Sequence, residues 1–341
     1  MKILLGMSGG VDSAFSAKAL INSGHCVEGA TLVMHDHTQT DMASLACKEL
    51  GIKLNVIDAK KSFLNIINNF IFEYSEGRTP NPCIICNERV KFRFLYEYAV
   101  ENGFDAIATG HYARIVKIDC DEGERFAVAM SDDVKKDQSY MLYRLPQEIL
   151  RFLILPLSHL KKAEVRQLSA DAGISASKSK DSQEICFLPD GSHAEFVESV
   201  IGKSPEGDFV DAEGRVLGRH KGIIRYTVGQ RKGLGISLGE RVFVSRIDAK
   251  DNTVTLSRTN DGRSEFFVKD VVFSGMSKVK EDTTVTLDVK IRYSAATIQA
   301  EVTFFKDGKA FVRLKTSSTP APGQSAVFYK DGVVMAGGFI E

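Results

Sequence analysis

The first two dozen residues constrain the fold more than any other part of the chain. An apolar run at 3–7 has the composition of a buried strand, and Ser8-Gly9-Gly10-Val11-Asp12-Ser13 follows it at once. A helical pattern follows and should end at Gly24, because glycine favours the end of a helix. A glycine-rich turn between a strand and a helix is where α/β sheets bind phosphate. The start of the chain therefore predicts a sheet with a nucleotide site at its edge.

The rest of the first half repeats this alternation. Strand patterns lie at 27–33, 54–57 and 106–109. Helical patterns lie at 41–51, in the apolar stripe from Phe63 to Ile71, from near Asn87, and across 132–172, with 161–172 the clearest part. Strands separated by helices imply a parallel sheet with right-handed crossovers. The predicted class of this half is α/β.

The second half has a different pattern. Beyond Gly202, short alternating runs appear, and Asp307-Gly308 and Asp331-Gly332 stand between them as hairpin turns. We predict two small antiparallel β domains, the last a β-barrel, with a boundary near Phe267. The expected domains are a catalytic domain at 1–203, a central β domain at 204–266 and the barrel at 267–341.

Composition limits the partners and the compartment. Hydrophobic residues make up 43% of the 341 residues, which is typical of a globular chain. Lys+Arg and Asp+Glu are both 44, so net charge does not indicate a nucleic-acid partner. No stretch has the pattern of a signal peptide or a membrane span, so a cytoplasmic protein is expected.

One local run is basic. Between 215 and 232 there are six cations and no acidic residue: Arg215, Arg219, Lys221, Arg225, Arg231 and Lys232. A solvated face is the usual explanation of such a run. Glycines and Tyr226 are interleaved with it, so a loop that reaches RNA phosphates is the alternative.

The glycine-rich segment narrows the reaction. Its glycines let backbone N–H groups approach an anion, Ser8 and Ser13 add hydroxyl donors, and Asp12 could hold magnesium or orient the loop. The Gly-Lys-Ser/Thr ending of a Walker A loop is missing. The segment looks like the loop of enzymes that split ATP into AMP and pyrophosphate, which indicates activation by adenylation. Thiolation of tRNA, synthesis of guanylate, argininosuccinate or NAD, and lysidine formation all share this step.

The cysteines fall into two groups. Cys26 and Cys47 stand in apolar contexts typical of small core residues. Cys83 and Cys86 follow a proline-rich loop that opens a helix, where a helix N-terminus would lower the thiol pKa. A structural zinc site would need a second cysteine pair, so we do not expect one. A redox pair and an iron–sulfur site with Cys186 remain alternatives.

Several segments together resemble the bacterial tRNA-specific 2-thiouridylase family along essentially the whole chain. They are Gly6 to Ser13, Gly77-Arg78-Thr79-Pro80-Asn81-Pro82, Cys86-Asn87 with Lys91-Phe92, Ala108 to Arg114, Lys136 to Tyr140, Asp181-Ser182 with Ile185-Cys186-Phe187, Tyr226 to Gly235, Arg292-Tyr293 and Pro322-Gly323-Gln324. The loop alone is shared by a superfamily, whereas the ordered set is specific. The resemblance implies a Rossmann-like adenine nucleotide alpha-hydrolase domain at the N-terminus.

The resemblance also implies roles for single residues. ATP would be bound by Gly6, Met7, Ser8, Gly9, Gly10, Val11, Asp12, Ser13, Met34 and Gly110. Cys186 would carry sulfur as a persulfide, and Cys86 would end in a disulfide with it. The target base would lie against Asn81, Pro82 and Cys83. Contacts to tRNA would come from His111, Lys136, Asp137, Gln138, Arg292, Tyr293 and Gln324, with Arg231 and Lys232 as candidates for phosphates.

The activity implied is 2-thiolation of the wobble uridine of tRNA, with ATP and magnesium as cofactors. The partners would be the tRNA anticodon arm and a cysteine desulfurase or sulfur-relay protein. The chain departs from the family at Cys83, where Asp, a proposed base, is frequent, and in a short stretch between Met34 and Asp41.

The departure at Cys83 leaves open which group deprotonates the incoming sulfur. It also keeps two iron–sulfur alternatives in view, a cluster-dependent thiolation and a non-enzymatic RNA-binding sensor. An amidating or condensing synthetase is a further alternative, although it would give no role to the cysteines.

Overall fold

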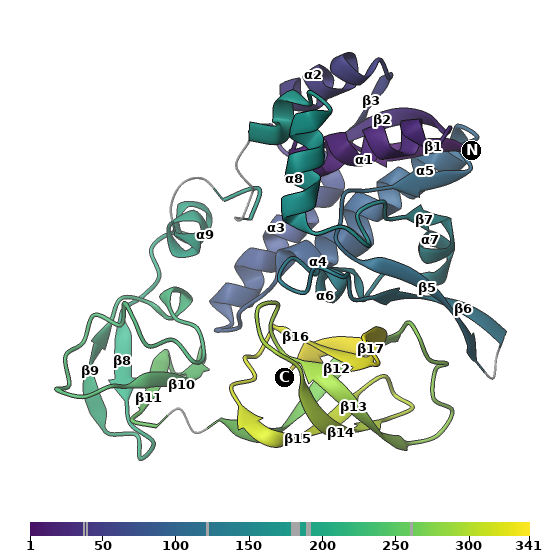
Figure 1. Cartoon of the computed structure of the whole chain (residues 1–341). Coiled ribbons are helices and arrows are strands. Elements are labelled where there is room, and N and C mark those ends of the chain that lie inside the picture. Colours follow the sequence, from purple (N-terminus) through teal and green to yellow (C-terminus); the bar gives the residue numbers. More distant parts are fainter. Residues whose placement is uncertain (37, 39, 121–122, 179–184, 189–191, 260–261) are drawn as a thin grey trace.

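A parallel sheet of five strands forms the centre of the N-terminal domain (Figure 1), in the order β3-β2-β1-β4-β7. The strands are β1 (Lys2–Gly6), β2 (Cys26–Val33), β3 (Leu54–Asp58), β4 (Ala106–Ala108) and β7 (Leu153–Ile154). This computed structural model describes residues 1–341 except 37, 39, 121–122, 179–184, 189–191 and 260–261. The α/β class and its parallel sheet are confirmed.

The sheet is buried on both faces, which explains the continuous apolar run of β1. Leu4 packs into one core with residues of α3 (Lys60–Ser75) and α5 (Phe92–Glu101). Ile3 and Leu5 point to the opposite face, because side chains alternate along a strand. There they pack with residues of α1 (Val11–Asn22) and α2 (Asp41–Leu50).

One predicted helix starts earlier than expected. The sequence pattern placed its beginning near Asn87, but α4 spans Pro82–Cys86 and continues through a π-helical turn, Asn87–Lys91, into α5. Asn81 caps α4 by accepting a hydrogen bond from the Cys83 N–H at 3.2 Å, and Pro82 occupies the first turn. Asparagine before proline is a strong helix start. Cys83 and Cys86 therefore lie within a helix.

The region expected to be helical across 132–172 is interrupted. It contains α6 (Ser139–Leu142), α7 (Gln147–Phe152), the edge strand β7 and then α8 (Lys162–Asp171). The strand was missed because its two residues carry too little pattern to distinguish them from the adjoining helix. Before this region a hairpin of β5 (Arg114–Cys120) and β6 (Gly123–Ala129) extends toward the C-terminal domain.

The central domain is a four-stranded sheet in the order β10-β11-β8-β9. Its strands are β8 (Gly207–Val210), β9 (Val216–His220), β10 (Phe243–Asp248) and β11 (Thr253–Ser257). Neighbouring strands pair antiparallel, except β11 and β8, which are parallel. Its core is continuous with α3 and α9 (His193–Ile201) through Phe70, Val197 and Phe209. The central domain is thus packed on the N-terminal domain.

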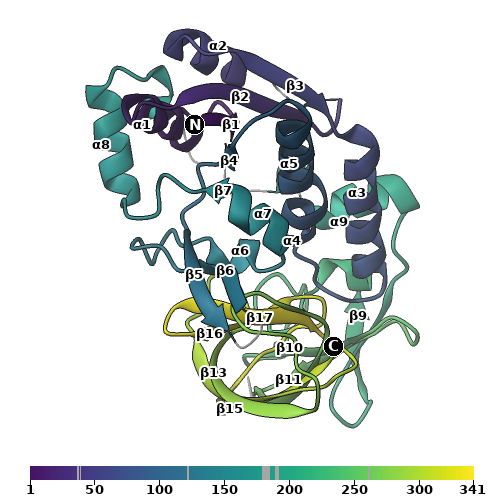
Figure 2. The ribbon, with the colours of Figure 1, turned by 90° about the vertical axis from the view of Figure 1, so that its right-hand side faces the viewer.

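The C-terminal domain is a closed barrel of six strands, which lies beside the central domain in Figure 1 and overlaps it in the view of Figure 2. The strands are β12 (Arg263–Phe273), β13 (Thr283–Lys290), β14 (Ile298–Phe304), β15 (Ala310–Ser318), β16 (Ser325–Lys330) and β17 (Val333–Ile340), and pairing of β12 with β17 closes the ring. The predicted barrel is confirmed, as is the turn at Asp331-Gly332, where both residues have positive φ. The boundaries of the three domains remain a prediction.

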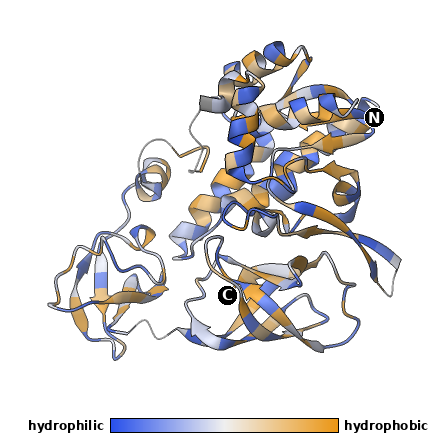
Figure 3. Cartoon of the chain, in the orientation of Figure 1, coloured by the Kyte–Doolittle hydropathy of each residue, from blue (hydrophilic) through white to orange (hydrophobic). Residues whose placement is uncertain are grey.

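Hydropathy follows these layers. Apolar residues gather along the strands of the parallel sheet and along the barrel strands (Figure 3). Phe304 and Phe328 are fully buried in the barrel and meet edge to face with ring centroids 5.4 Å apart. Within the described residues, no helix is both long and apolar enough to cross a bilayer.

Candidate active site

The glycine-rich loop is held by hydrogen bonds among its own residues. The Ser8 N–H donates to Ser13 Oγ at 3.3 Å, the Gly10 N–H donates to Ser8 Oγ at 3.3 Å, and Ser13 Oγ donates to the Gly10 carbonyl at 3.0 Å. Gly10 precedes α1 without a side-chain cap, so the loop lies at the positive end of the helix dipole. This is the arrangement that binds an anion.

Two glycines are required by close approach as well as by conformation. Gly9 has φ +78°, and a Cβ there would lie 2.5 Å from the backbone carbon of Met42 at the start of α2. A Cβ on Gly110 would lie 2.8 Å from the backbone of Asp12. The loop is therefore enclosed by α2 on one side and by the segment after β4 on the other.

Asp12 is engaged by two residues to which the sequence analysis assigned no role. Lys162 Nζ donates to both carboxylate oxygens, at 2.8 and 2.6 Å, and Tyr112 Oη donates to Oδ1 at 2.7 Å. Among the described residues no group of three or more His, Cys, Asp or Glu side chains is arranged to hold a metal ion. Magnesium binding at Asp12 remains a prediction, in which phosphate oxygens would have to supply further ligands.

Met34 lies just after β2, beside the loop that the sequence marked as short. Its N–H and that of His35 both donate to Thr38 Oγ1, at 3.1 and 3.0 Å. A local turn therefore sets the backbone at this predicted adenosine-side position.

The thiols are less acidic than the sequence suggested. Cys86 is buried in the main core, and burial raises its pKa to about 11. Burial also raises the pKa of Cys83, and surrounding protein atoms raise that of Cys186, although Cys186 is exposed at the surface. The expected lowering by the helix N-terminus is wrong, because removal of the thiolate from water outweighs the dipole.

The three thiols interact electrostatically. The charges of Cys83 and Cys186 raise the pKa of Cys86, and that of Cys83 raises the pKa of Cys186. Phe187 packs edge to face on Phe63 and Phe70 of α3, with centroids 5.7 and 5.3 Å away, which anchors the segment of Cys186. The motif residues Asp181 and Ser182 lie outside the described residues.

Lys91 is a cation that acts on all three thiols, and no role was predicted for it from the sequence. Its charge lowers the pKa of Cys83, Cys86 and Cys186. A hydrogen bond from its backbone N–H also lowers the pKa of Cys86. The π-helical turn adds one residue to the helix before α5, and Lys91 ends that turn. Such turns are frequent at functional sites.

The segment after β4 connects the loop with the thiol site. Gly110 and Tyr112 contact Asp12, while His111 packs on Phe92 with the rings tilted by 41° and centroids 5.4 Å apart, and its Nδ1 is hydrogen-bonded to Thr109 Oγ1 at 2.9 Å. Burial and the nearby Lys91 lower the pKa of His111 to about 3. His111 is therefore neutral near physiological pH.

The chain is similar to known proteins over its whole length. Family models for a tRNA methyl transferase HUP domain, a tRNA methyl transferase PRC-barrel domain and an aminomethyltransferase β-barrel domain match residues 1–190, 194–258 and 263–340. The tRNA-specific 2-thiouridylase MnmA of Treponema denticola is 40% identical, with 100% of this chain and 98% of that protein covered. That of Acetivibrio thermocellus is 41% identical, with 100% and 99% covered.

The chain belongs to the tRNA-specific 2-thiouridylase family. The resemblance inferred from the motifs is confirmed, as is the Rossmann-like HUP domain at the N-terminus. A fold of this kind implies ATP binding. The roles of single residues remain predictions.

In this member of the family, some residues predicted to contact tRNA have partners within the protein. Asp137 is buried and accepts hydrogen bonds from the Ser131 N–H at 3.0 Å and from Ser139 Oγ at 2.7 Å. Gln138 Oε1 accepts from the Tyr112 N–H at 2.9 Å. As they lie here, Asp137 and Gln138 support the backbone at Ser131 and Tyr112. Lys136 ends the turn that precedes them, and its N–H donates to the Asp133 carbonyl at 3.0 Å.

Three residues of the barrel domain, also predicted to contact tRNA, bind neighbouring parts of the chain. Gln324 donates to the Thr79 carbonyl at 2.8 Å, next to the loop that leads to Asn81 and Pro82. Arg292 donates to the Val228 and Thr319 carbonyls, both at 3.0 Å, and so joins the central domain to the barrel. Tyr293 packs near Tyr140, with ring centroids 6.2 Å apart. The Gln324 contact thus ties the predicted base-binding loop to the barrel.

The basic run is partly neutralised by acidic residues from outside it. Arg215 pairs with Asp211 at 2.6 Å, Arg219 pairs with Asp208 at 2.8 Å, and Arg225 pairs with Glu198. The sequence could not show this, because the partners lie outside the run. Arg231 and Lys232 are exposed and, within the described ranges, form no salt bridge. They remain the candidates for RNA phosphates.

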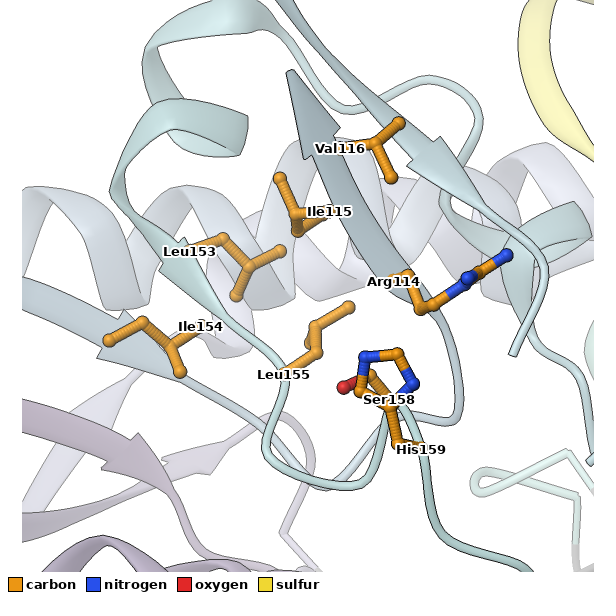
Figure 4. A pocket seen from close by; sticks show the side chains of 8 residues that line it. All are labelled: Arg114, Ile115, Val116, Leu153, Ile154, Leu155, Ser158 and His159. Carbon is orange, nitrogen blue, oxygen red and sulfur yellow. The ribbon is translucent and has the colours of Figure 1, made fainter. Parts of the chain in front are cut away.

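Two cavities lie away from the loop and the thiols. One, of about 340 Å³, is lined by β5 and β7 residues together with Ser158 and His159 (Figure 4). The other, of about 300 Å³, lies between the start of α9 and the basic run and is lined by His193, Lys221 and Tyr226, among others. Neither contains a residue predicted to bind ATP or to carry sulfur.

Proposed function

We propose that this chain catalyses ATP-dependent 2-thiolation of the wobble uridine of tRNA, as the names of its relatives indicate for them. The observation that carries the proposal is the segment from Gly110 to Tyr112. This segment contacts Asp12 of the nucleotide loop. The charge of Lys91, which lowers the pKa of the three thiols, also lowers the pKa of His111 in this segment. A uridine whose oxygen is activated at the nucleotide loop could therefore also be reached by sulfur carried on a thiol.

The first step makes a leaving group. The C2 oxygen of uridine attacks the α-phosphorus of ATP, one P–O bond forms, and one breaks as pyrophosphate departs. Backbone N–H groups of the loop would hold the phosphates, with Ser8 and Ser13 beside them. A uracil oxygen is otherwise a poor leaving group, so the step converts it into a part of AMP.

The second step transfers sulfur. The terminal sulfur of a Cys186 persulfide bonds to C2, and AMP leaves with the former C2 oxygen. The Cys86 thiolate bonds the Cys186 sulfur as the S–S bond of the persulfide breaks, so two thiols are oxidised while the transferred sulfur is reduced. Cys86 attacks after or before the sulfur reaches C2, and both orders end in a disulfide that an external thiol must reduce.

Burial supports this chemistry. Water would return the adenylated base to uridine, so the site has to exclude it. Cys86 is only 6% exposed, whereas Cys186 is at the surface, where a persulfide donor such as a cysteine desulfurase or relay protein can reach it. The tRNA anticodon arm would contact the central domain and the barrel, with the base taken out of its stack.

The direct test uses purified protein with ATP, a persulfide donor and tRNA. The expected products are 2-thiouridine, AMP and pyrophosphate, and release of ADP would refute the adenylation step. Cys186→Ser should abolish thiolation while adenylation of tRNA continues. Cys120→Ser, on the β5–β6 hairpin, is the matched control and should keep full activity.

The iron–sulfur alternatives have a separate test. An anaerobic absorption spectrum of the purified chain should lack the visible charge-transfer bands of a cluster. Strong bands that disappear in Cys83→Ser would favour cluster-dependent thiolation over the persulfide route.

A further inference from the structure

Lys162 is placed where a lysine is unfavourable for stability. It is the first residue of α8, at the positive end of the helix dipole, and its side chain is only 11% exposed. A buried ammonium at a helix N-terminus loses hydration and meets a like partial charge. A cation kept in such a position needs a compensating anion nearby.

Asp12 supplies that compensation. Both of its oxygens accept from Lys162 Nζ, at 2.8 and 2.6 Å, across 150 positions of sequence. Asp12 lies in the first turn of α1, so the ammonium stands beside the loop expected to bind phosphates. The Asp12 side chain is 32% exposed, so the pair borders solvent at the loop.

The loop itself has no cation. Residues 6–13 include neither Lys nor Arg, whereas a Walker A loop carries its lysine within the motif. Pyrophosphate leaves with several negative charges, and backbone N–H groups offset only part of them. The structure brings a lysine to the same position from α8.

We propose that Lys162 is a phosphate-binding residue of the nucleotide site, held by Asp12 until ATP enters and then bonded to the phosphates of ATP. The proposal rests on the proposed use of ATP at this loop. Before ATP binds, Asp12 offsets the cost of the buried ammonium. With ATP bound, phosphate oxygens take over that compensation, and the positive charge stabilises the departing pyrophosphate.

The test compares the binding of ATP and of adenosine in the absence of tRNA. Lys162→Met should weaken ATP binding at least about 10-fold, the size expected for one charge-assisted hydrogen bond, and leave adenosine binding unchanged. Lys162→Arg should recover most of the ATP affinity. A lysine that only supports the fold would affect ATP and adenosine equally, and that result would overturn the proposal.

Lys161→Met is the matched control. Lys161 is exposed and directly precedes Lys162, so the control removes the same charge one position away. Its ATP affinity should equal that of the unmodified chain. If the unmodified chain bound no ATP, the proposed function itself would fail. If Lys162→Met bound ATP normally, only the role of Lys162 would be refuted.

A measurement on the unmodified chain does not depend on the stability of Lys162→Met. In protein labelled with [15N]lysine, the Nζ signal of Lys162 can be assigned by its absence from Lys162→Arg. Inorganic pyrophosphate should shift this signal, and adenosine should not. A signal that pyrophosphate leaves unmoved would contradict the contact.

Discussion

The nucleotide loop and the thiol site are prepared for chemistry in opposite ways. The loop is ordered by its own hydrogen bonds, and its carboxylate is already paired with a buried cation. At the thiol site, burial raises the pKa of Cys83 and Cys86, and surrounding protein atoms raise that of the exposed Cys186, so the thiols are protonated near neutral pH. The phosphate half is ready before a substrate arrives, whereas the sulfur half has to be activated.

The difference has a physical origin. Polar loops can be organised by contacts between residues a few positions apart, such as Ser8 and Ser13. Buried thiols remain neutral because a low dielectric disfavours the thiolate, and Lys91 offsets this only in part. Neutral thiols would protect the carrier from oxidation until the substrate is in place.

The largest effect should come from Gly9→Val. The new side chain needs φ +78° and would meet the backbone of Met42 within 2.5 Å, so the loop has to move. A displacement of about 1 Å costs on the order of 100-fold, and ATP binding and adenylation should fall at least that much. Gly24→Ala, at a positive-φ position with open space around it, is the control. Normal ATP binding by Gly9→Val would refute the pre-organised loop.

A pH profile of thiol alkylation should show the next largest effect. With a pKa of about 11, the Cys86 thiolate fraction rises about 10-fold per pH unit from pH 7 to 10, measured by peptide mass spectrometry after brief alkylation. In the unfolded chain the rate should level off near the ordinary thiol pKa. Because the folded pKa is raised, the stability that Cys86 contributes is present below about pH 9 and is lost toward pH 11. A plateau below pH 9 in the folded chain would contradict the burial effect.

Lys91→Met should have a smaller effect, a slower alkylation of the thiols together with a higher pKa of His111. Without this charge, the pKa of Cys86 and of Cys186 should rise further, and alkylation at pH 8 should slow several-fold. The pKa of His111, measured by NMR, should rise because a neighbouring cation no longer opposes protonation. Arg89→Met, an exposed change in the same π-helical turn, should alter neither. Unchanged thiols in Lys91→Met would remove this residue from the site.

Tyr112→Phe should have the smallest effect. It removes the 2.7 Å hydrogen bond to Asp12, which contributes about 1 kcal/mol to the free energy of unfolding. ATP affinity should fall a few-fold, and alkylation of Cys86 should stay the same. Tyr98→Phe removes a comparable bond to Asn55 and should reduce stability without affecting ATP. A change in thiol reactivity would show that the two halves are coupled through Tyr112.

Short-range features could be predicted from the amino-acid sequence. The strand, glycine turn and helix at the start, the change to β structure beyond Gly202 and the turn at Asp331-Gly332 depend on neighbouring residues and on hydrophobic periodicity. The family followed from ordered motifs. The start of α4 was missed although Asn81 and Pro82 signal it locally, because the proline-rich segment was interpreted as a loop.

Only the tertiary structure decided the electrostatics of the site. Tyr112 and Lys162 reach Asp12 from 100 and 150 positions away, and Lys91 acts on Cys186 from a different part of the chain. Burial reversed the expected shift of the thiol pKa values. Solvent exposure and the distance between charges depend on how separate segments pack, and no local pattern of residues encodes them.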